Sequence, residues 1–115
     1  MKQFLATGID IVEVNRFKNF NKKSRLAFNT FTEKELSDCF SRANPSASLA
    51  ARFAAKEAVV KCIGEIRYNK IEIKTQKRGR PAVKLLDRKL AKMYNFTISI
   101  SHTDRLAVAV CVVWK

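Results

Sequence analysis

The sequence predicts an α+β domain in which a small antiparallel sheet packs with one long, buried central helix. Three observations lead to this fold class. An alanine-rich run over residues 46–63 contains no glycine or proline, which favours a helix. Short segments rich in Ile and Val lie near both ends of the chain and are typical of strands. No repeat or low-complexity segment divides the 115 residues, so we expect one domain over residues 1–115.

The first third of the chain contains one strand and two expected helices. Residues 3–12 are rich in Ile, Val, Leu and Phe and predict a mostly buried strand. A helix is expected to begin at about Glu13. Thr32 and Glu35 have the spacing of a capping box, which predicts a second helix that runs to about Phe40.

The long helix is expected to follow the break at Asn44-Pro45, with a serine N-cap at Ser46 and a glycine stop at Gly64. Gly and Pro residues near position 80 indicate a hairpin-like turn. The remaining expected elements are strands at 71–75 and 83–86 around the turn 78–81, a short helix from Asp87 to about Tyr94, and a final hairpin of strands 96–101 and 106–113.

Glu57 is the first candidate functional residue. At 100° per residue it shares a stripe of the long helix with Ala54 and Lys61, and most of the remaining circumference is apolar. A carboxylate in such a helix needs a partner or a cation. One interpretation is a simple i,i+4 pair with Lys61. The other is that Glu57 faces a metal ion or a substrate.

Asp10 is a second carboxylate in an unusual place. It follows Gly8 and stands between Ile9 and Ile11 in the predicted N-terminal strand, where an unpaired buried charge costs stability. It either points to a polar face, marks the end of the strand, or serves a functional site.

Three motifs resemble those of a known family. They are Gly8-Ile9-Asp10 with Glu13 and Arg16; Phe53-x-x-Lys56-Glu57-Ala58-x-x-Lys61; and Ile98-Ser99-Ile100-Ser101-His102-Thr103. Their order and spacing resemble those of the 4′-phosphopantetheinyl transferases, in particular the small single-domain type, over essentially the whole chain. One departure is a shorter loop after Gly64 than the family usually carries.

The resemblance implies the 4′-phosphopantetheinyl transferase fold and a homotrimer with shared active sites. It also implies transfer of 4′-phosphopantetheine from coenzyme A to a serine of an acidic apo-acyl carrier protein, which releases 3′,5′-ADP. Mg²⁺ suits such a reaction because it takes one or two carboxylates together with substrate phosphates. We therefore expect Asp10 and Glu57 to bind Mg²⁺ and to act in catalysis with Lys61, which would stabilise or protonate the leaving group.

Weaker expectations concern the surrounding residues. Lys56 lies off the Glu57 stripe and is either a charge on the helix surface or a ligand. Glu57, or a water that it orients, is a candidate base for the serine proton. The resemblance places Arg52 and His102 near the nucleotide and its phosphates, although His102 could instead be a turn residue bonded to the backbone. It places Gly79 and Pro81 at a loop over the adenine. It also implies that an acidic carrier protein docks on four cations: Arg16, Lys22, Lys23 and Arg25.

Charge supports a polyanionic partner. The chain has 23 Lys and Arg against 10 Asp and Glu, a net charge of +13. One alternative function is therefore a small basic nucleic-acid-binding module, which the basic turn near residue 79 would serve; no Cys/His zinc spacing and no ribonucleoprotein-type aromatic motif supports it. Another alternative is a non-catalytic trimeric relative of the enzyme. The preferred function involves neither nucleic acid nor a membrane.

Cysteine content and the termini favour a cytoplasmic protein. The three cysteines lack a Cys-x-x-Cys spacing and are expected to be packed thiols in a reducing compartment. The N-terminus does not have the pattern of a signal peptide. Residues 106–114 are continuously apolar but too few to cross a bilayer as a helix. Because this last strand is apolar at both parities, both of its faces should be covered, one of them by a subunit interface.

Overall fold

The computed structural model describes residues 4–115, apart from the side chain of Lys77, and contains two sheets and four α-helices in that range. Three short 3₁₀ helices connect them. In chain order the elements are β1 (Leu5–Glu13), η1 (Val14–Phe17), α1 (Arg25–Thr30), α2 (Glu33–Phe40), α3 (Pro45–Ile63), η2 (Tyr68–Lys70), β2 (Ile71–Thr75), η3 (Lys77–Gly79), β3 (Pro81–Leu85), α4 (Arg88–Met93), β4 (Asn95–His102) and β5 (Leu106–Trp114).

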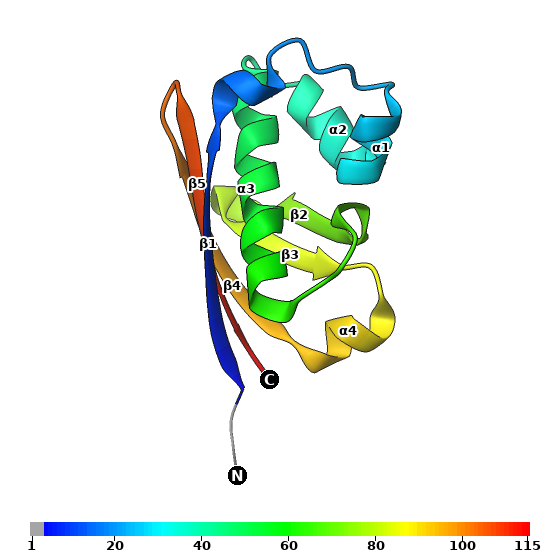
Figure 1. Cartoon of the computed structure of the whole chain (residues 1–115), viewed down its shortest axis with the longest axis vertical. Coiled ribbons are helices and arrows are strands. Elements are labelled where there is room, and N and C mark those ends of the chain that lie inside the picture. The colour runs from blue at the N-terminus through cyan, green and yellow to red at the C-terminus, as the bar shows by residue number, and fades with distance from the viewer. Residues whose placement is uncertain (1–3) are drawn as a thin grey trace.

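The main sheet is antiparallel and has the strand order β1-β5-β4. Its register aligns Leu5 with Trp114 and Asn95 with the same Trp114, so β5 is paired with β1 along its whole length and with β4 from Ala107 to Trp114. The helix α3 lies against one face of this sheet, over β1 and β5, as Figure 1 shows. The predicted α+β class and the antiparallel sheet with a long buried helix are confirmed.

The N-cap of the long helix lies two residues earlier than expected. Asn44, and not Ser46, is the N-cap: its side chain accepts a hydrogen bond from the Ala47 N–H at 3.2 Å, and Pro45 occupies the first turn. The Ser46 hydroxyl donates instead to the Phe17 carbonyl at 3.2 Å. The stop at Gly64 is confirmed, because its φ of 91° lies in the region that glycine adopts readily.

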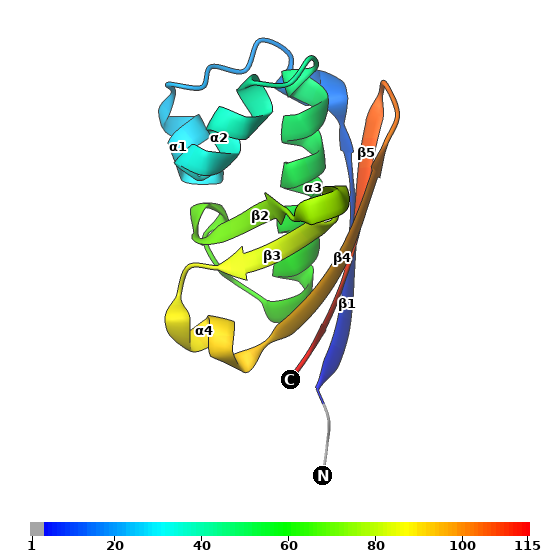
Figure 2. The same cartoon turned by 180° about the vertical axis from the view of Figure 1, so that it is seen from behind.

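A second layer lies on the far side of α3. The hairpin of β2 and β3 crosses α3 and lies next to β4, while α1 and α2 occupy one end of the molecule and α4 the other (Figures 1 and 2). The capping box of α2 is present, with Thr32 and Glu35 each bonded to the other's backbone. The prediction of a helix from about Glu13 is wrong in length, because only the 3₁₀ turn η1 forms there and α1 follows after a loop.

The core is made by aromatic and small aliphatic side chains. Phe17 lies at the centre of an aromatic cluster, 5.4 Å from Phe20, 6.0 Å from Phe31 and 5.7 Å from Phe53 between ring centroids. The face of β5 that meets α3 carries small residues, which lets the helix lie close to the sheet. All three cysteines are free and buried, as expected: Cys39, Cys62 and Cys111.

The opposite face of the main sheet is apolar and uncovered in the single chain. On β1, Ile9 and Ile11 are 61% and 62% exposed, and on β5, Val110 and Trp114 are each 40% exposed. The expectation that both faces of the last strand are covered therefore holds within one chain only for the side that meets α3. Among residues 4–115, no helix is long and apolar enough to cross a membrane.

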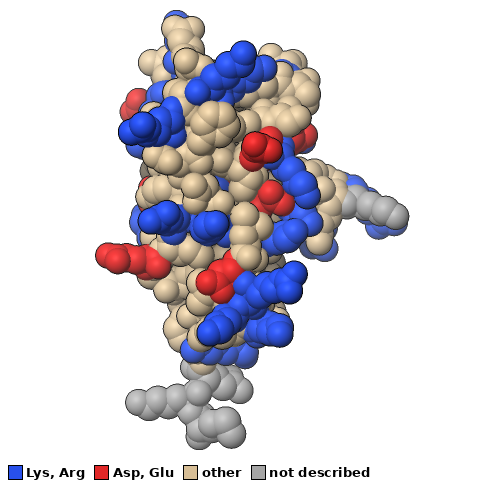
Figure 3. All heavy atoms as spheres, turned by 90° about the vertical axis from the view of Figure 1, so that its right-hand side faces the viewer, with Lys and Arg blue, Asp and Glu red and all other residues tan. Residues whose placement is uncertain are grey.

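The charged surface is mostly basic. Figure 3 shows Lys and Arg side chains spread over the face that carries α1 and α4, with fewer acidic side chains between them. Such a surface favours a partner that carries negative charge.

Candidate functional site

The site begins with a close approach of β1 to α3 at Gly8. A Cβ atom on Gly8 would lie 2.1 Å from the Ala58 carbonyl oxygen and 3.1 Å from the Cβ of Lys61. Only glycine fits such a contact. Because side chains alternate along a strand, Asp10 lies on the same face of β1 as Gly8, turned toward α3 and not toward the exposed face that carries Ile9 and Ile11.

Lys61 binds Asp10 across this contact. Its ammonium donates to the Ile9 carbonyl oxygen at 2.8 Å and lies 3.3 Å from Asp10 Oδ1. The Asp10 side chain is 19% exposed and that of Lys61 52%, so the pair is open to solvent and to a substrate. Among the described residues no Glu57–Lys61 ion pair forms, and the simple i,i+4 interpretation is therefore wrong.

Glu57 is bonded to a tyrosine that the sequence did not suggest. The Tyr68 hydroxyl donates to Glu57 Oε1 at 2.6 Å. This hydrogen bond is the main reason that the pKa of Tyr68 is raised to about 12; burial and the charges of Glu57 and Asp10 raise it further, whereas Arg16 lowers it. Glu57 stands one turn before Lys61 on α3, and Lys61 contacts Asp10, so the two carboxylates occupy neighbouring positions on α3 and β1.

Sequence reasoning missed Tyr68 because it lies 11 residues beyond Glu57, outside every motif. It stands in η2, which returns toward α3 after Gly64. Neither hydrophobic period nor motif spacing could signal this contact, since the position of η2 depends on tertiary packing.

Lys56 is neither a surface charge nor a ligand at this site, contrary to both expectations. Its side chain is fully buried, with the ammonium 2.6 Å from Glu35 Oε1. It also donates to the carbonyl oxygens of Tyr68 at 2.8 Å and Ile71 at 2.6 Å. Burial lowers the pKa of Lys56, and the charge of Glu35 opposes that shift. This lysine of the second motif joins α3 to α2 and η2.

The cations expected to dock a carrier protein divide into two groups. The Arg16 guanidinium lies 4.8 Å from the centre of the Phe53 ring, next to the carboxylate site. Lys22 lies over the Phe40 ring at 5.6 Å, and Lys23 and Arg25 are exposed beside it at the start of α1. All four lie between the end of β1 and the first residue of α1, Arg25.

The residues expected near a nucleotide are not brought to the carboxylates within one chain. Arg52 is buried on another side of α3 and pairs with Asp38 on α2. His102 is exposed at the end of β4, two strands from β1 in the sheet order. Gly79, with a φ of 77°, and Pro81 lie at the turn between β2 and β3, where Pro81 faces Phe96 across a small pocket.

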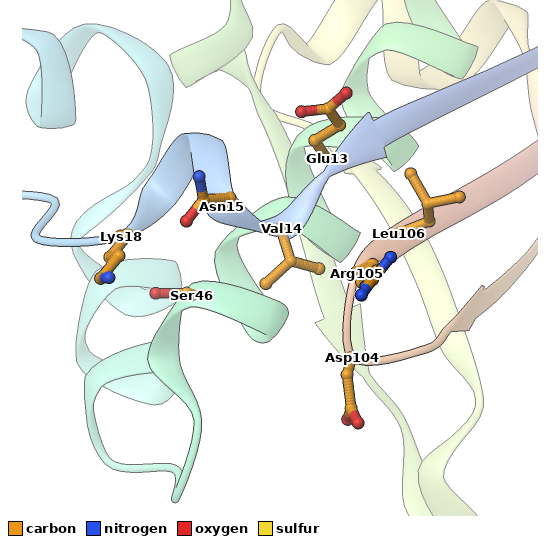
Figure 4. Close-up of a pocket in the computed structure, with 8 residues that line it drawn as sticks. All are labelled: Glu13, Val14, Asn15, Lys18, Ser46, Asp104, Arg105 and Leu106. Carbon is orange, nitrogen blue, oxygen red and sulfur yellow. The ribbon is translucent and has the colours of Figure 1, made fainter.

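A cavity of about 650 Å³ lies apart from Asp10 and Glu57. Figure 4 shows that its lining comes from the end of β1, η1, the first turn of α3 and the loop between β4 and β5. It contains two cations, Lys18 and Arg105, and two carboxylates, Glu13 and Asp104. None of the expected catalytic residues lines it.

Comparison with known proteins gives a consistent result. Residues 6–111 match the family described as the 4′-phosphopantetheinyl transferase superfamily. A holo-[acyl-carrier-protein] synthase of Moorella thermoacetica is 41% identical over 119 aligned positions, covering 95% of this chain and 93% of the relative.

Two solved structures share the fold. A holo-(acyl-carrier-protein) synthase from Bacillus anthracis in complex with CoA (3′,5′-ADP) has a TM-score of 0.83 at 29% identity, with 99% of both chains covered. A holo-[acyl-carrier-protein] synthase from Neisseria meningitidis has a TM-score of 0.80 at 31% identity, with 96% of this chain and 98% of that one covered.

Proposed function

The chain belongs to the 4′-phosphopantetheinyl transferase superfamily, and from this premise we propose that it transfers 4′-phosphopantetheine from coenzyme A to a serine of an apo-acyl carrier protein, releasing 3′,5′-ADP. The observation that carries the proposal is the contact of Asp10 with Lys61, one turn beyond Glu57 on α3, at the place where β1 meets α3. The reaction is attack of a hydroxyl on the β-phosphorus of a pyrophosphate, which requires positioning and neutralisation of charge.

Mg²⁺ is the metal that these residues fit. Among the described residues no group of three or more His, Cys, Asp or Glu side chains forms a full cage for a metal ion. Asp10 and Glu57 supply two carboxylates, which is the number that Mg²⁺ commonly takes when substrate phosphates and waters complete its shell. When bound, Mg²⁺ would neutralise charge on the pyrophosphate oxygens.

Lys61 and Glu57 supply the remaining chemistry. The Lys61 ammonium is half exposed beside Asp10, so it can bind a phosphate oxygen and stabilise or protonate the leaving group. Glu57, or a water that it orients, takes the serine proton. Tyr68 occupies only Oε1 of Glu57 in the contact above.

We extend the proposal to the whole assembly as a homotrimer with shared sites. His102 and the turn at Gly79 and Pro81 lie away from Asp10 within one chain, so a neighbouring subunit would bring them to the nucleotide. Arg52 remains a candidate for the phosphates, though its guanidinium is held by Asp38. The uncovered apolar face of β1 and β5 supports a subunit interface.

The acidic carrier protein would dock on the cations that precede and begin α1, with Arg16 nearest to the site. A single domain over residues 1–115 performs the reaction in the cytoplasm, where coenzyme A is available and the three free cysteines stay reduced.

The test is a transfer assay. The protein is mixed with coenzyme A, Mg²⁺ and an apo-acyl carrier protein, and mass spectrometry measures the addition of one phosphopantetheine. Asp10→Asn and Glu57→Gln keep the shape of each side chain and should lower the rate by at least about a hundredfold, since even partners of metal ligands are worth 10–100-fold. Chelation of Mg²⁺ should abolish transfer reversibly, and Mn²⁺ should partly replace it.

Glu65→Gln is the matched control, because Glu65 is an exposed carboxylate just beyond α3. No added mass with the wild-type protein would refute the proposal in favour of a nucleic-acid-binding module or a non-catalytic relative. Near-normal activity of Asp10→Asn at low Mg²⁺ would refute the shared metal.

A further inference from the structure

Tyr68 stands out as a polar group at the site whose position is fixed on three sides. Its hydroxyl donates to Glu57 Oε1 at 2.6 Å. Its ring packs against Phe53, with 5.4 Å between ring centroids and an interplanar angle of 53°. Its carbonyl oxygen accepts a hydrogen bond from the Lys56 ammonium at 2.8 Å.

The Lys56 contact connects Tyr68 to a fully buried network. Lys56 and Glu35 have no exposed side-chain surface, and their ion pair measures 2.6 Å. Glu35 in turn accepts hydrogen bonds from the backbone N–H groups of Thr32 at 2.9 Å and Ile73 at 2.8 Å. Such a satisfied buried network is rigid, so the backbone of η2 has a defined place relative to α3.

From this arrangement we propose that Tyr68 is a positioning residue for Glu57, holding Oε1 so that Oε2 is presented to the metal. The inference rests on the proposed function, because it assigns the metal to Glu57. A carboxylate with one oxygen bonded to a fixed donor loses rotational freedom. Groups that orient a metal ligand in this way are commonly worth 10–100-fold in metal affinity or activity.

The competing interpretation is that Tyr68 only fills space beside Phe53. Phenylalanine would serve that purpose equally well, since it keeps the ring and removes only the hydroxyl. Tyr68→Phe therefore separates positioning from packing. Tyr94→Phe is the matched control: Tyr94 is the chain's other tyrosine, also half-buried, and packs on Phe4 and Phe96.

The first readout is direct binding of Mn²⁺, followed by electron paramagnetic resonance of the free ion, with no coenzyme A or carrier protein present. We expect the Kd of Tyr68→Phe for Mn²⁺ to rise about tenfold over wild type, whereas Tyr94→Phe should match wild type. The second readout is the Mg²⁺ dependence of transfer. The Mg²⁺ concentration for half-maximal rate should rise by a similar factor, while kcat at saturating Mg²⁺ recovers to within about threefold of wild type.

Unchanged Mn²⁺ affinity in Tyr68→Phe would overturn the proposal, and so would a wild-type protein that binds no Mn²⁺. An equal loss in Tyr94→Phe would also overturn it, because removal of any tyrosine hydroxyl would then suffice. Failure of the proposed function gives a different result: wild-type protein would bind Mn²⁺ more tightly than Tyr68→Phe yet transfer no phosphopantetheine.

Discussion

Gly8 is the residue on which the geometry of the site depends most directly. It lets β1 contact the backbone of α3 at Ala58, and this contact places Asp10 beside Lys61. A methyl group cannot be accommodated by a rotamer change, because the nearest atom belongs to the helix backbone. The strand and the helix would have to separate.

We therefore predict that Gly8→Ala lowers both stability and activity. Overpacking of this kind costs about 1–3 kcal/mol or more in the free energy of unfolding. The shift between Asp10 and Lys61 should lower the transfer rate on the order of a hundredfold, since small misplacements of reacting groups have effects of that size. Denaturant unfolding and the transfer assay measure the two effects.

Gly64→Ala provides the comparison. Gly64 differs from Gly8 in having a positive φ, of 91°, and a Cβ there meets no atom within 4 Å. Its ψ of −161° places it in a region essentially restricted to glycine, so Gly64→Ala should lose roughly 1–3 kcal/mol from conformation alone and keep its transfer rate. If Gly8→Ala behaved in the same way, the close contact would not organise the site.

Sequence reasoning at this scale found the residues that a motif carries. Asp10 and Lys61 were expected at one site and are in contact, whereas the metal that Asp10 would share with Glu57 stays a prediction. It assigned Lys56 wrongly because helical position alone cannot show that α2 supplies Glu35 as a buried partner. Tyr68 was missed for the related reason that it reaches the site only through the fold of η2.

At the scale of elements, one buried ion pair joins α2, α3 and η2. The Glu35 carboxylate serves the capping box of α2 through the Thr32 N–H and also binds Lys56 on α3. Lys56 then binds the carbonyl oxygens of Tyr68 and Ile71. Loss of the cation would leave a charged carboxylate buried without its partner, which is costly.

Lys56→Met should therefore destabilise the protein by about 3–5 kcal/mol. Adding Glu35→Gln should recover part of that loss, because glutamine removes the uncompensated charge and can still accept a backbone hydrogen bond. Urea unfolding at one fixed protomer concentration measures all three proteins. A double variant less stable than Lys56→Met would show that Glu35 does not need its cation.

Elements with their own end signals were the ones that the sequence predicted well. The capping box of α2, the Asp87 cap of α4 and the glycine end of α3 are all present. The segment between β1 and α2 was predicted poorly. Its helices are short, and η1 is held by the insertion of Phe17 into the aromatic cluster, which no local pattern encodes.

At the scale of the molecule, the net charge of +13 gives a prediction about the carrier protein. Reversal of Lys23 and Arg25 to Glu should raise the KM for carrier protein roughly 3–10-fold while leaving the KM for coenzyme A nearly unchanged. The reason is that long-range attraction between these cations and the acidic carrier protein increases the rate at which the two proteins associate. Added salt should weaken the wild type in the same way. Arg16 is excluded from this variant because it contacts Phe53 beside Tyr68.

Reversal of both Lys89 and Lys92 to Glu, on exposed α4 at the other end of the molecule, lowers the net charge by the same amount and is the control. Equal effects of both variants would mean that total charge, and not a docking surface before α1, attracts the carrier protein. Equal damage to both KM values would place Lys23 and Arg25 in the coenzyme A site instead.

The uncovered face of the main sheet concerns the assembly. Residues of one parity on β5, Ala107, Ala109, Cys111 and Val113, are buried against α3. The other parity, which includes Val110, pairs across the sheet with Ile9 and extends the exposed apolar surface onto β1. An apolar surface made of adjacent strands favours contact with another subunit. The sequence predicted that both faces of the last strand are covered, and the strand register identifies the side chains of the face that is still exposed in the single chain.

Val110→Glu should consequently dissociate the proposed trimer without damaging the core. Val110 is 40% exposed in the single chain, so a charge there meets solvent in a monomer but would be buried at a subunit interface. Leu86→Glu is the matched control, since Leu86 has the same 40% exposure and lies outside the main sheet, between β3 and α4. Sedimentation at micromolar concentration should give a trimer for wild type and Leu86→Glu, and a folded monomer for Val110→Glu.

Transfer activity should disappear with the trimer if His102 and the turn at Gly79 act across subunits. A wild-type protein that sediments as a fully active monomer would exclude both the interface and the shared site.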